Sequence, residues 1–464
     1  MKIIKFEREL KVLINYIREY GIQHIEGISN PSDILDDESK WSEFAQAVHK
    51  GFYLAQNRSI ILIKQVLTER KQQIQKLKEA RRGREKEKCN EITNVLYQLK
   101  YQEMCLRKIM DSIAWQILGY DLSQLRRLYY GQELIDITDS NLESEVSFID
   151  EYLKDNLDSF VLISDLTSFI QIGDVVIFKP REKVILVELK EGDTNGKVFR
   201  LLDEFITANC KYPAYQKLMN ETPKFQEQFQ RDIKQIQRSS QVVQTLNTGK
   251  GKDLLSNVDV VINRSETIVL DTYTDIIKSL LDESDKKGHA ISVVEECLLI
   301  GVYNTEKFPS KVFDIWAKCL NIKMPIIDFR QALFDPLGYP IYLHSLSQSQ
   351  ILDVILGKKI VKFTIDIEMW LHTFKNHGIT YRWMSKKETA RINGKFKGNQ
   401  GVFSLEGCGI ELENNEGLKQ ILGEGVFSRM FTSLNTPSSL IKYLKKIICI
   451  ILNSHYRIYD NKTR

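Results

Sequence analysis

The stretch from Ile60 to Ile109 constrains the fold most, because it contains no proline and a single glycine, Gly83. Apolar residues recur along it at the three- and four-residue intervals of an amphipathic helix. Two long antiparallel helices, or one coiled-coil arm, fit this pattern, with the bend at Gly83. We therefore expect residues 1–118 to form a helical N-terminal region, of the kind that mediates self-association or docking.

Basic residues are concentrated in one part of this helical region. Between Arg70 and Lys88 there are nine Lys or Arg and three Glu, whereas the whole chain of 464 residues has a net charge of only +4. A run of this kind is ordinarily a solvated helix face. The alternative is a strip that contacts the phosphates of a nucleic acid.

The composition is that of a folded chain with more than one domain. Hydrophobic residues make up 43% and charged residues 27% of the 464 residues, which is typical of globular proteins of two or three domains. No segment reaches the roughly 18 to 20 apolar residues of a membrane helix. The seven cysteines are scattered, without a Cys-x2-Cys pair, which argues against a disulfide framework and a structural zinc. We expect a cytoplasmic protein that does not contact membranes.

The middle of the chain changes to an α/β pattern. An apolar helical stripe at Val146, Ile149, Leu153 and Leu157 precedes three segments of strand character, at 160–163, 174–178 and 183–190. A glutamine-rich helix at 225–246 and a buried strand at 297–303 follow. The order α-β-β-β-α-β predicts a mixed α/β layered domain over residues 119–305. Residues 306–464 are expected to form a mixed α/β C-terminal region of unknown role.

The second and third of these strand segments are expected to pair as a hairpin. If Pro180, Arg181 and Glu182 form the turn, the numbers of each cross-strand pair add to 362, and Asp174 lies opposite Glu188. Opposed residues share a face of the sheet, with Cβ atoms about 5 Å apart. Lys190, two residues beyond Glu188, is then on the same face. One register therefore gathers two carboxylates and one ammonium group, although a bulge would shift the pairing by a residue.

Such a cluster suits phosphodiester hydrolysis. Two close carboxylates repel each other unless a cation lies between them. Oxygen ligands of this kind select a hard divalent ion such as Mg²⁺, which acidifies a bound water and neutralises charge on a phosphate. A nearby lysine can orient that water or stabilise the charged phosphate. The alternative is a surface salt bridge at a strand end.

These residues resemble the signature of the PD-(D/E)XK nuclease superfamily, the restriction-endonuclease-like fold. Ile172-Gly173-Asp174 is followed, after thirteen residues, by Val187-Glu188-Leu189-Lys190. The resemblance covers residues 140 to about 305. It implies that Asp174 and Glu188 bind Mg²⁺ or Mn²⁺, that Leu189 contributes its backbone carbonyl, and that Lys190 assists the attacking water.

The resemblance also implies two helical contributions to the site. A glutamate on the first core helix often joins it, and Glu145 is the better match because capping of that helix accounts for Glu143. A glutamine on the helix after the third strand is often followed four residues later by tyrosine. Gln237 and Gln241 have this spacing, but 241 is glutamine, so either could be the site residue. Gly173 stands where the signature has proline.

Lys179, Arg181 and Lys183 surround the expected hairpin turn. They would contact the DNA backbone or be solvated turn charges. The resemblance implies a Mg²⁺-dependent endonuclease that cleaves DNA, with RNA as the alternative substrate, in bacterial antiphage defence or restriction; Shedu-type nucleases are similar in having such a core flanked by other domains. The rival hypotheses are an inactive nucleic-acid-binding protein and a coiled-coil scaffold. We also expect a homo-oligomer assembled through the helical N-terminal region.

Overall fold

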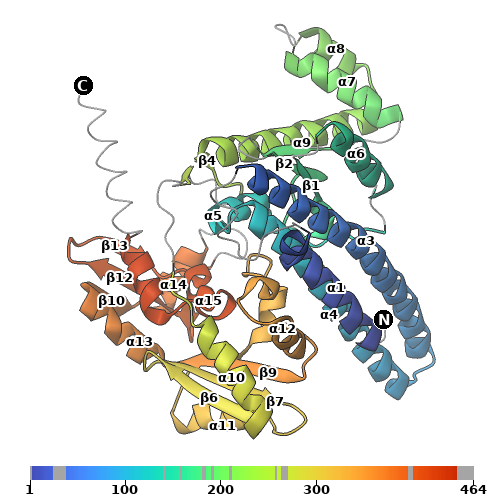
Figure 1. Cartoon of the computed structure of the whole chain (residues 1–464). Coiled ribbons are helices and arrows are strands. Elements are labelled where there is room, and N and C mark those ends of the chain that lie inside the picture. Colours follow the sequence, from blue (N-terminus) through green and yellow to red (C-terminus); the bar gives the residue numbers. More distant parts are fainter. Residues whose placement is uncertain are drawn as a thin grey trace. The chain divides into compact units, whose positions relative to one another are not determined.

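The computed structural model describes residues 3–24, 38–138, 142–156, 159–179, 184–189, 193–207, 212–255, 259–262, 270–394 and 401–446. It is a mixed α/β structure with several small antiparallel sheets (Figure 1). The chain divides into two compact units. The first comprises residues 15–264, and the second comprises residues 2–14 and 265–464. The three predicted regions do not coincide with these units, because the N-terminal helices belong to the same unit as the three central strands.

Two long antiparallel helices, α3 (Glu38–Arg82) and α4 (Lys86–Ile117), dominate the first unit. The predicted bend at Gly83 is confirmed: its N–H donates to the Glu79 carbonyl at 2.9 Å, and Arg84 adopts a φ of 56°. Apolar side chains on the facing sides of the two helices are buried at both levels of the hairpin; they are Leu62, Ile63, Val66, Leu67, Leu99, Leu106 and Ile109. The hairpin is therefore held by an apolar seam with the helical period.

A three-stranded antiparallel sheet follows, with the order β1-β2-β3 (Phe160–Ile163, Val175–Phe178 and Ile185–Val187). The register pairs Val175 with Val187 and Ile177 with Ile185, so the predicted sum of 362 is confirmed. Every residue of β1 and β2 is buried. Gln56 of α3 fixes β1 through its amide, which donates to the Val161 carbonyl at 3.2 Å and accepts from the Ile163 N–H at 3.0 Å.

Helices surround this sheet in the first unit. Before it lie α2 (Tyr20–Gln23), α5 (Leu122–Leu125) and α6 (Leu142–Asp155); Ser140, the expected cap of α6, is outside the described residues. After it come α7 (Asp193–Thr207), α8 (Tyr212–Met219) and α9 (Pro223–Thr248), then a small pair, β4 (Lys250–Lys252) and β5 (Asp259–Val261). Thr222 caps α9 by accepting from the Phe225 N–H at 3.3 Å, and Gly249 ends it with a φ of 74°.

The main sheet of the second unit has the order β6-β7-β9-β8 (His289–Val294, Leu298–Asn304, Lys359–Ile365 and Ile327–Asp328). The apolar run at 297–303 does form a buried strand, β7, as its composition predicts. Its expected place was wrong: β7 pairs with β6 and β9 in this sheet and does not close the sheet of β1 to β3. Helix α10 (Thr274–Lys287) packs on β6 and β7, and residues 3–14 of α1 (Ile3–Arg18) belong to this unit.

The C-terminal part of the second unit is mixed α/β, as expected. Its sheet joins β10 (Ile379–Trp383), β12 (Cys408–Asn414), β11 (Ser404–Leu405) and β13 (Lys419–Ile421). The remaining helices of the unit are α11 (Lys311–Cys319), α12 (Gln348–Ile355), α13 (Ile367–Phe374), α14 (Lys386–Asn393) and α15 (Glu424–Thr432). Capping boxes begin α12 and α14, where Ser347 and Ser385 exchange hydrogen bonds with the third helical residue. Among the helices of the described residues, none is both long enough and apolar enough to cross a membrane.

The imidazole of His344 gives the second unit a pH-dependent stability. The ring is buried, and its Nε2 bonds the Thr432 carbonyl at 3.2 Å. Burial lowers the pKa of His344 to about 4, whereas an unfolded histidine titrates near 6.5. Between these values the unfolded chain binds a proton that the folded chain does not, so the free energy of unfolding falls as the pH falls.

We expect the wild-type protein to lose up to about 3 kcal/mol of unfolding free energy from this group between pH 7.5 and pH 4. His344→Gln removes the titration, so its unfolding free energy should fall less over this range, whatever its stability at pH 7.5. Urea unfolding at a series of pH values measures both profiles. Parallel profiles for the two proteins would contradict the assignment.

Candidate functional site

Asp174 and Glu188 lie at the same end of the β2–β3 pair. Asp174 directly precedes β2 and Glu188 directly follows β3, and the last ladder pair joins their neighbours Val175 and Val187. β1 runs antiparallel to β2, and the Ser164 N–H donates to the Asp174 carbonyl at 3.0 Å. The C-terminal end of β1 therefore meets the two acids at one edge of the sheet.

Gly173 provides the backbone conformation that brings Asp174 into the sheet. Its φ is 76°, in the left-handed region that proline, restricted to about −65°, does not enter. A Cβ at this position would lie 3.3 Å from the Cβ of Leu186. Glycine therefore stands in place of the signature proline for a local conformational reason.

The carboxylate of Asp174 is held by the backbone of the opposite strand. Its Oδ2 accepts a hydrogen bond of 2.6 Å from the N–H of Leu189. The Asp174 N–H donates to the Val187 carbonyl at 2.9 Å, so the pairing shifts by one residue from the ladder register at this end, as in a bulge. Leu189, expected to act through its carbonyl, contacts the site here through its N–H.

Helix α9 holds the carboxylate of Glu188. Gln235 Nε2 donates to Oε2 at 2.5 Å, and the Ser239 hydroxyl lies 3.3 Å from Oε1. These two residues are four apart, hence on one face of the helix. The expected glutamines are placed elsewhere. Gln237 is exposed, two residues and about 200° around the helix from Gln235. Gln241 donates to the Lys252 carbonyl at 3.3 Å.

The other residues expected at the site have separate outcomes. Glu145 is buried on α6, with 2% of its surface exposed, and α6 contacts β1. Lys179 is half-buried just after β2. Lys190, Arg181 and Lys183 lie outside the described residues.

Asp165 is an acid near the site that the sequence reasoning missed. It follows β1 by two residues, at the edge where β1 meets Asp174. Burial raises the pKa of Asp165 to about 6, the carboxylate of Asp174 raises it further, and the Arg107 guanidinium opposes the rise. The available signal was its position after an apolar strand that pairs antiparallel with β2, since that pairing brings the strand end beside Asp174.

The turn that carries Asp165 is fixed by the buried guanidinium of Arg107. This group, on α4, donates to the carbonyls of Asp165, Thr167 (3.1 Å) and Ile135 (2.9 Å). Glu103 neutralises it at 3.0 Å and also pairs with Arg70 of α3 at 2.6 Å. A charge that satisfies three carbonyls and one carboxylate therefore joins both long helices to the site edge.

A second buried ion pair lies one helical turn further along α4. Lys108 Nζ is 2.9 Å from Asp111 Oδ2, and both side chains are almost fully buried. Asp111 also accepts from the N–H and the hydroxyl of Ser168, at 2.7 and 2.5 Å. The turn after β1 is thus anchored to α4 at both ends.

The donor set has room for a hydrated divalent ion but not for a cage of protein ligands. Among the described residues, no group of three or more His, Cys, Asp or Glu side chains lies close enough to hold a metal. The carboxylates of Asp174 and Glu188 and the Leu189 carbonyl form a smaller set at one sheet edge. Mg²⁺ keeps several waters and is bound by one or two carboxylates, so this set fits Mg²⁺ with water completing its coordination.

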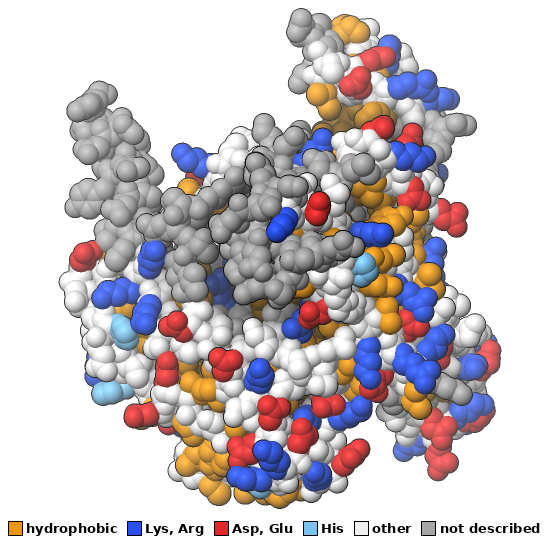
Figure 2. Space-filling view, in the orientation of Figure 1, with side chains coloured by type: hydrophobic (Ala, Val, Ile, Leu, Met, Phe, Trp, Pro, Cys, Tyr) orange, Lys and Arg blue, Asp and Glu red, His pale blue; other side chains and the backbone are white. Residues whose placement is uncertain are grey.

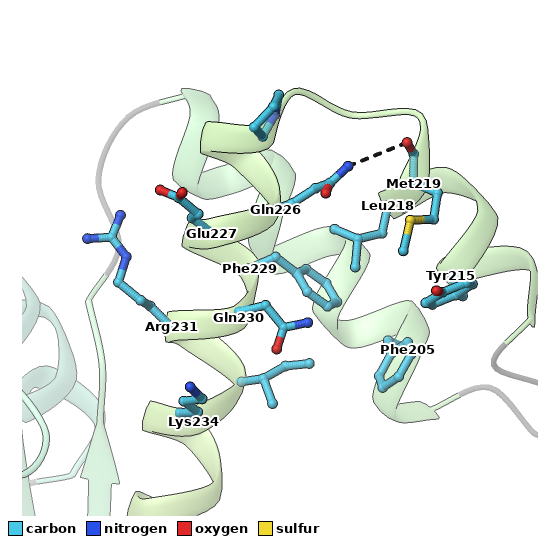
Figure 3. Close-up of a pocket in the computed structure, with 12 residues that line it drawn as sticks. Phe205, Tyr215, Leu218, Met219, Gln226, Glu227, Phe229, Gln230, Arg231 and Lys234 are labelled. Atoms are coloured by element: carbon cyan, nitrogen blue, oxygen red, sulfur yellow. Dashed lines mark hydrogen bonds between the residues drawn. The ribbon is translucent and has the colours of Figure 1, made fainter.

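A cavity of about 780 Å³ lies on another side of α9, bordered by α7 and α8 (Figure 3). Gln226, Phe229 and Gln230 project from α9 toward Tyr215 and Met219. Gln226 precedes Gln235 by nine residues, and at about 100° per residue the two point to opposite sides of the helix. The cavity is therefore separate from the site at Glu188.

Comparisons with known proteins give no match: no family model fits the sequence, and no curated protein and no solved structure is similar to the chain. The case for function therefore rests on the residues and their geometry.

We expect Arg107→Met to lower the free energy of unfolding by about 3–5 kcal/mol, because it leaves the buried Glu103 and three carbonyls without their donor. Urea unfolding at pH 7.5 measures the loss. Arg82→Met, a matched change at an exposed position, should alter stability by at most about 0.5 kcal/mol. A loss below about 1 kcal/mol for Arg107→Met would show that its contacts do not organise the fold.

Proposed function

We propose that the protein is a metal-dependent endonuclease that hydrolyses phosphodiester bonds in DNA. The observation that carries this proposal is the setting of two acids at one sheet edge, each held by hydrogen bonds. Asp174 is fixed by the Leu189 N–H, and Glu188 by Gln235 and Ser239. A solvated salt bridge at a strand end would not need a helix to orient its carboxylate.

The element order of the first unit supports a restriction-endonuclease-like core. Helix α6 precedes β1, β2 and β3, and α9 then contacts β3. The α-β-β-β-α part of the expected order is present, with α7 and α8 inserted before α9. The closing strand differs from expectation, since β4 and β5 pair with each other.

Each residue has a role in the proposed reaction. Bound Mg²⁺ or Mn²⁺ would supply an acidified water and neutralise charge on the phosphate. Asp174, Glu188 and the Leu189 carbonyl would hold the ion, and Glu145 is the candidate for a further contribution from α6. Gln235 and Ser239 keep the Glu188 carboxylate in one orientation, which preserves its basicity as a ligand. Lys190, directly after Leu189, would orient the attacking water, as the sequence signature implies.

Bacterial antiphage defence or restriction is the setting that we propose for this activity. DNA is the proposed substrate, RNA is the alternative, and a homo-oligomer through α3 and α4 is the proposed assembly. Lys179, Arg181 and Lys183, around the β2–β3 turn in sequence, are candidates for contacts with the DNA backbone.

We expect Glu188→Gln and Asp174→Asn each to reduce Mg²⁺-dependent cleavage of plasmid DNA by at least about a hundredfold, because each removes a charged ligand. Gel assays with Mg²⁺, with Mn²⁺ and with EDTA measure cleavage, and circular dichroism verifies folding. If the wild-type protein binds DNA but cleaves no DNA or RNA substrate with either metal, the inactive binding protein is the better hypothesis.

The contact between α9 and Glu188 gives a second test. Gln235→Ala should weaken metal-dependent cleavage about 10- to 100-fold, because the ligand carboxylate loses its orienting donor. Gln237→Ala, on the same helix but exposed, should leave the rate unchanged. Titration of the cleavage rate against Mg²⁺ should show a higher half-saturating concentration for Gln235→Ala alone. Equal effects of the two substitutions would refute the role given to Gln235.

A further inference from the structure

The turn between α3 and α4 carries as much net charge as the whole chain. Residues 76–88, which we call the basic tip, contain seven basic residues and three glutamates, a net charge of +4, and the chain as a whole also has +4. The basic residues are Lys76, Lys78, Arg81, Arg82, Arg84, Lys86 and Lys88. The rest of the protein is therefore balanced, and its excess positive charge is confined to one hairpin end.

The charge of the basic tip is barely neutralised. Lys88 pairs with Glu85 at 3.0 Å, and none of the other six cations makes an ion pair within the described ranges. Lower on the same helix the pattern differs, since Arg70 and Lys71 pair with Glu103 and Asp136 at 2.6 and 3.5 Å. The cations near the body of the unit are used structurally, whereas those at the tip are not.

The arrangement at the tip is unfavourable for the protein alone. All seven basic residues are exposed, and Lys and Arg side chains appear along the hairpin, with acidic ones among them, in Figure 2. Lys78 and Arg82 are four residues apart on α3, and like charges at this spacing destabilise a helix. A solvated helix face usually alternates the two signs. A bound polyanion would remove this repulsion.

The tip offers charge without apolar surface. Large exposed apolar side chains occur nearby, at Ile74 and Tyr97, but none lies within residues 76–88. Protein interfaces bury an apolar centre, while contacts with the nucleic-acid backbone are made by Lys and Arg with phosphates. The chemistry of the tip therefore matches a phosphate backbone better than a protein surface.

The hairpin sets the distance between the tip and the candidate site. Gln56 binds β1 at Ile163, which pairs with Val175 next to Asp174. Arg82 lies 26 residues further along α3, or about 39 Å at about 1.5 Å per residue. Arg70, linked through Glu103 to Arg107 and the Asp165 turn, is nearer, 12 residues or about 18 Å from Arg82. At about 3.4 Å per base pair, this range is about five to eleven base pairs of duplex.

We propose that the basic tip binds the sugar–phosphate backbone of double-stranded DNA, about five to eleven base pairs from the cleaved bond. The identity of the ligand rests on the proposed function. The tip would add affinity without sequence preference, because phosphate contacts carry no base information.

The test measures how DNA binding depends on salt when four tip cations are neutralised. The tip variant is Arg81→Gln, Arg82→Gln, Arg84→Gln and Lys86→Gln. A matched control removes four exposed lysines of the second unit, as Lys278→Gln, Lys311→Gln, Lys318→Gln and Lys323→Gln. Fluorescence anisotropy with a 40-base-pair duplex in EDTA gives Kd from 50 to 200 mM KCl without requiring cleavage. Circular dichroism verifies the helices of each variant.

The release of about 0.9 counterion per phosphate contact defines the expected result. If all four cations contact phosphates, the wild-type protein loses about 150-fold more affinity across this salt range than the tip variant. The control variant should keep the wild-type slope. Equal slopes for the tip variant and the wild-type protein would overturn the inference, even if the protein cleaves DNA. A reduced slope in a protein that cleaves nothing would support the tip and refute the nuclease.

Discussion

The buried guanidinium of Arg107 is the interaction on which the first unit depends. It joins α4 to the turn after β1, to the carbonyl of Ile135 and, through Glu103, to α3. A buried charge is tolerated only where its hydrogen bonds are satisfied, and here the partners come from segments far apart in sequence. The edge of the sheet that carries Asp174 therefore has a defined position only when the two long helices are already packed.

Helix α9 then determines the orientation of the acids. Because Gln235 and Ser239 are four residues apart, one helix face supplies both hydrogen bonds to Glu188. The opposite strand supplies the bond to Asp174 through the Leu189 N–H. The two carboxylates are thus held by independent elements, one by a side-chain pair on a helix and one by the backbone. Such a site tolerates little rotation of α9 about its own axis.

Local patterns in the sequence predicted what local interactions decide. The bend at Gly83 and the β2–β3 register followed from a single glycine and from the turn at Pro180. The site glutamine did not, because three glutamines lie within seven residues and only the packing of α9 selects Gln235. Asp165 and the place of β7 depend on strand pairing between distant segments, which no periodicity encodes. Long-range contacts therefore account for the errors.

The first helix has a practical consequence for dissecting the protein. Residues 3–14 of α1 belong to the second unit, where the Gln348 amide donates to the Lys11 carbonyl at 2.9 Å and Lys358 pairs with Glu7 at 3.3 Å. Phe6, Leu10 and Leu13 of this segment are buried. A fragment that starts at residue 265 would lack the segment, and one that stops at residue 264 would expose it. Separate expression of either unit thus requires moving the N-terminal dozen residues by circular permutation or a designed graft.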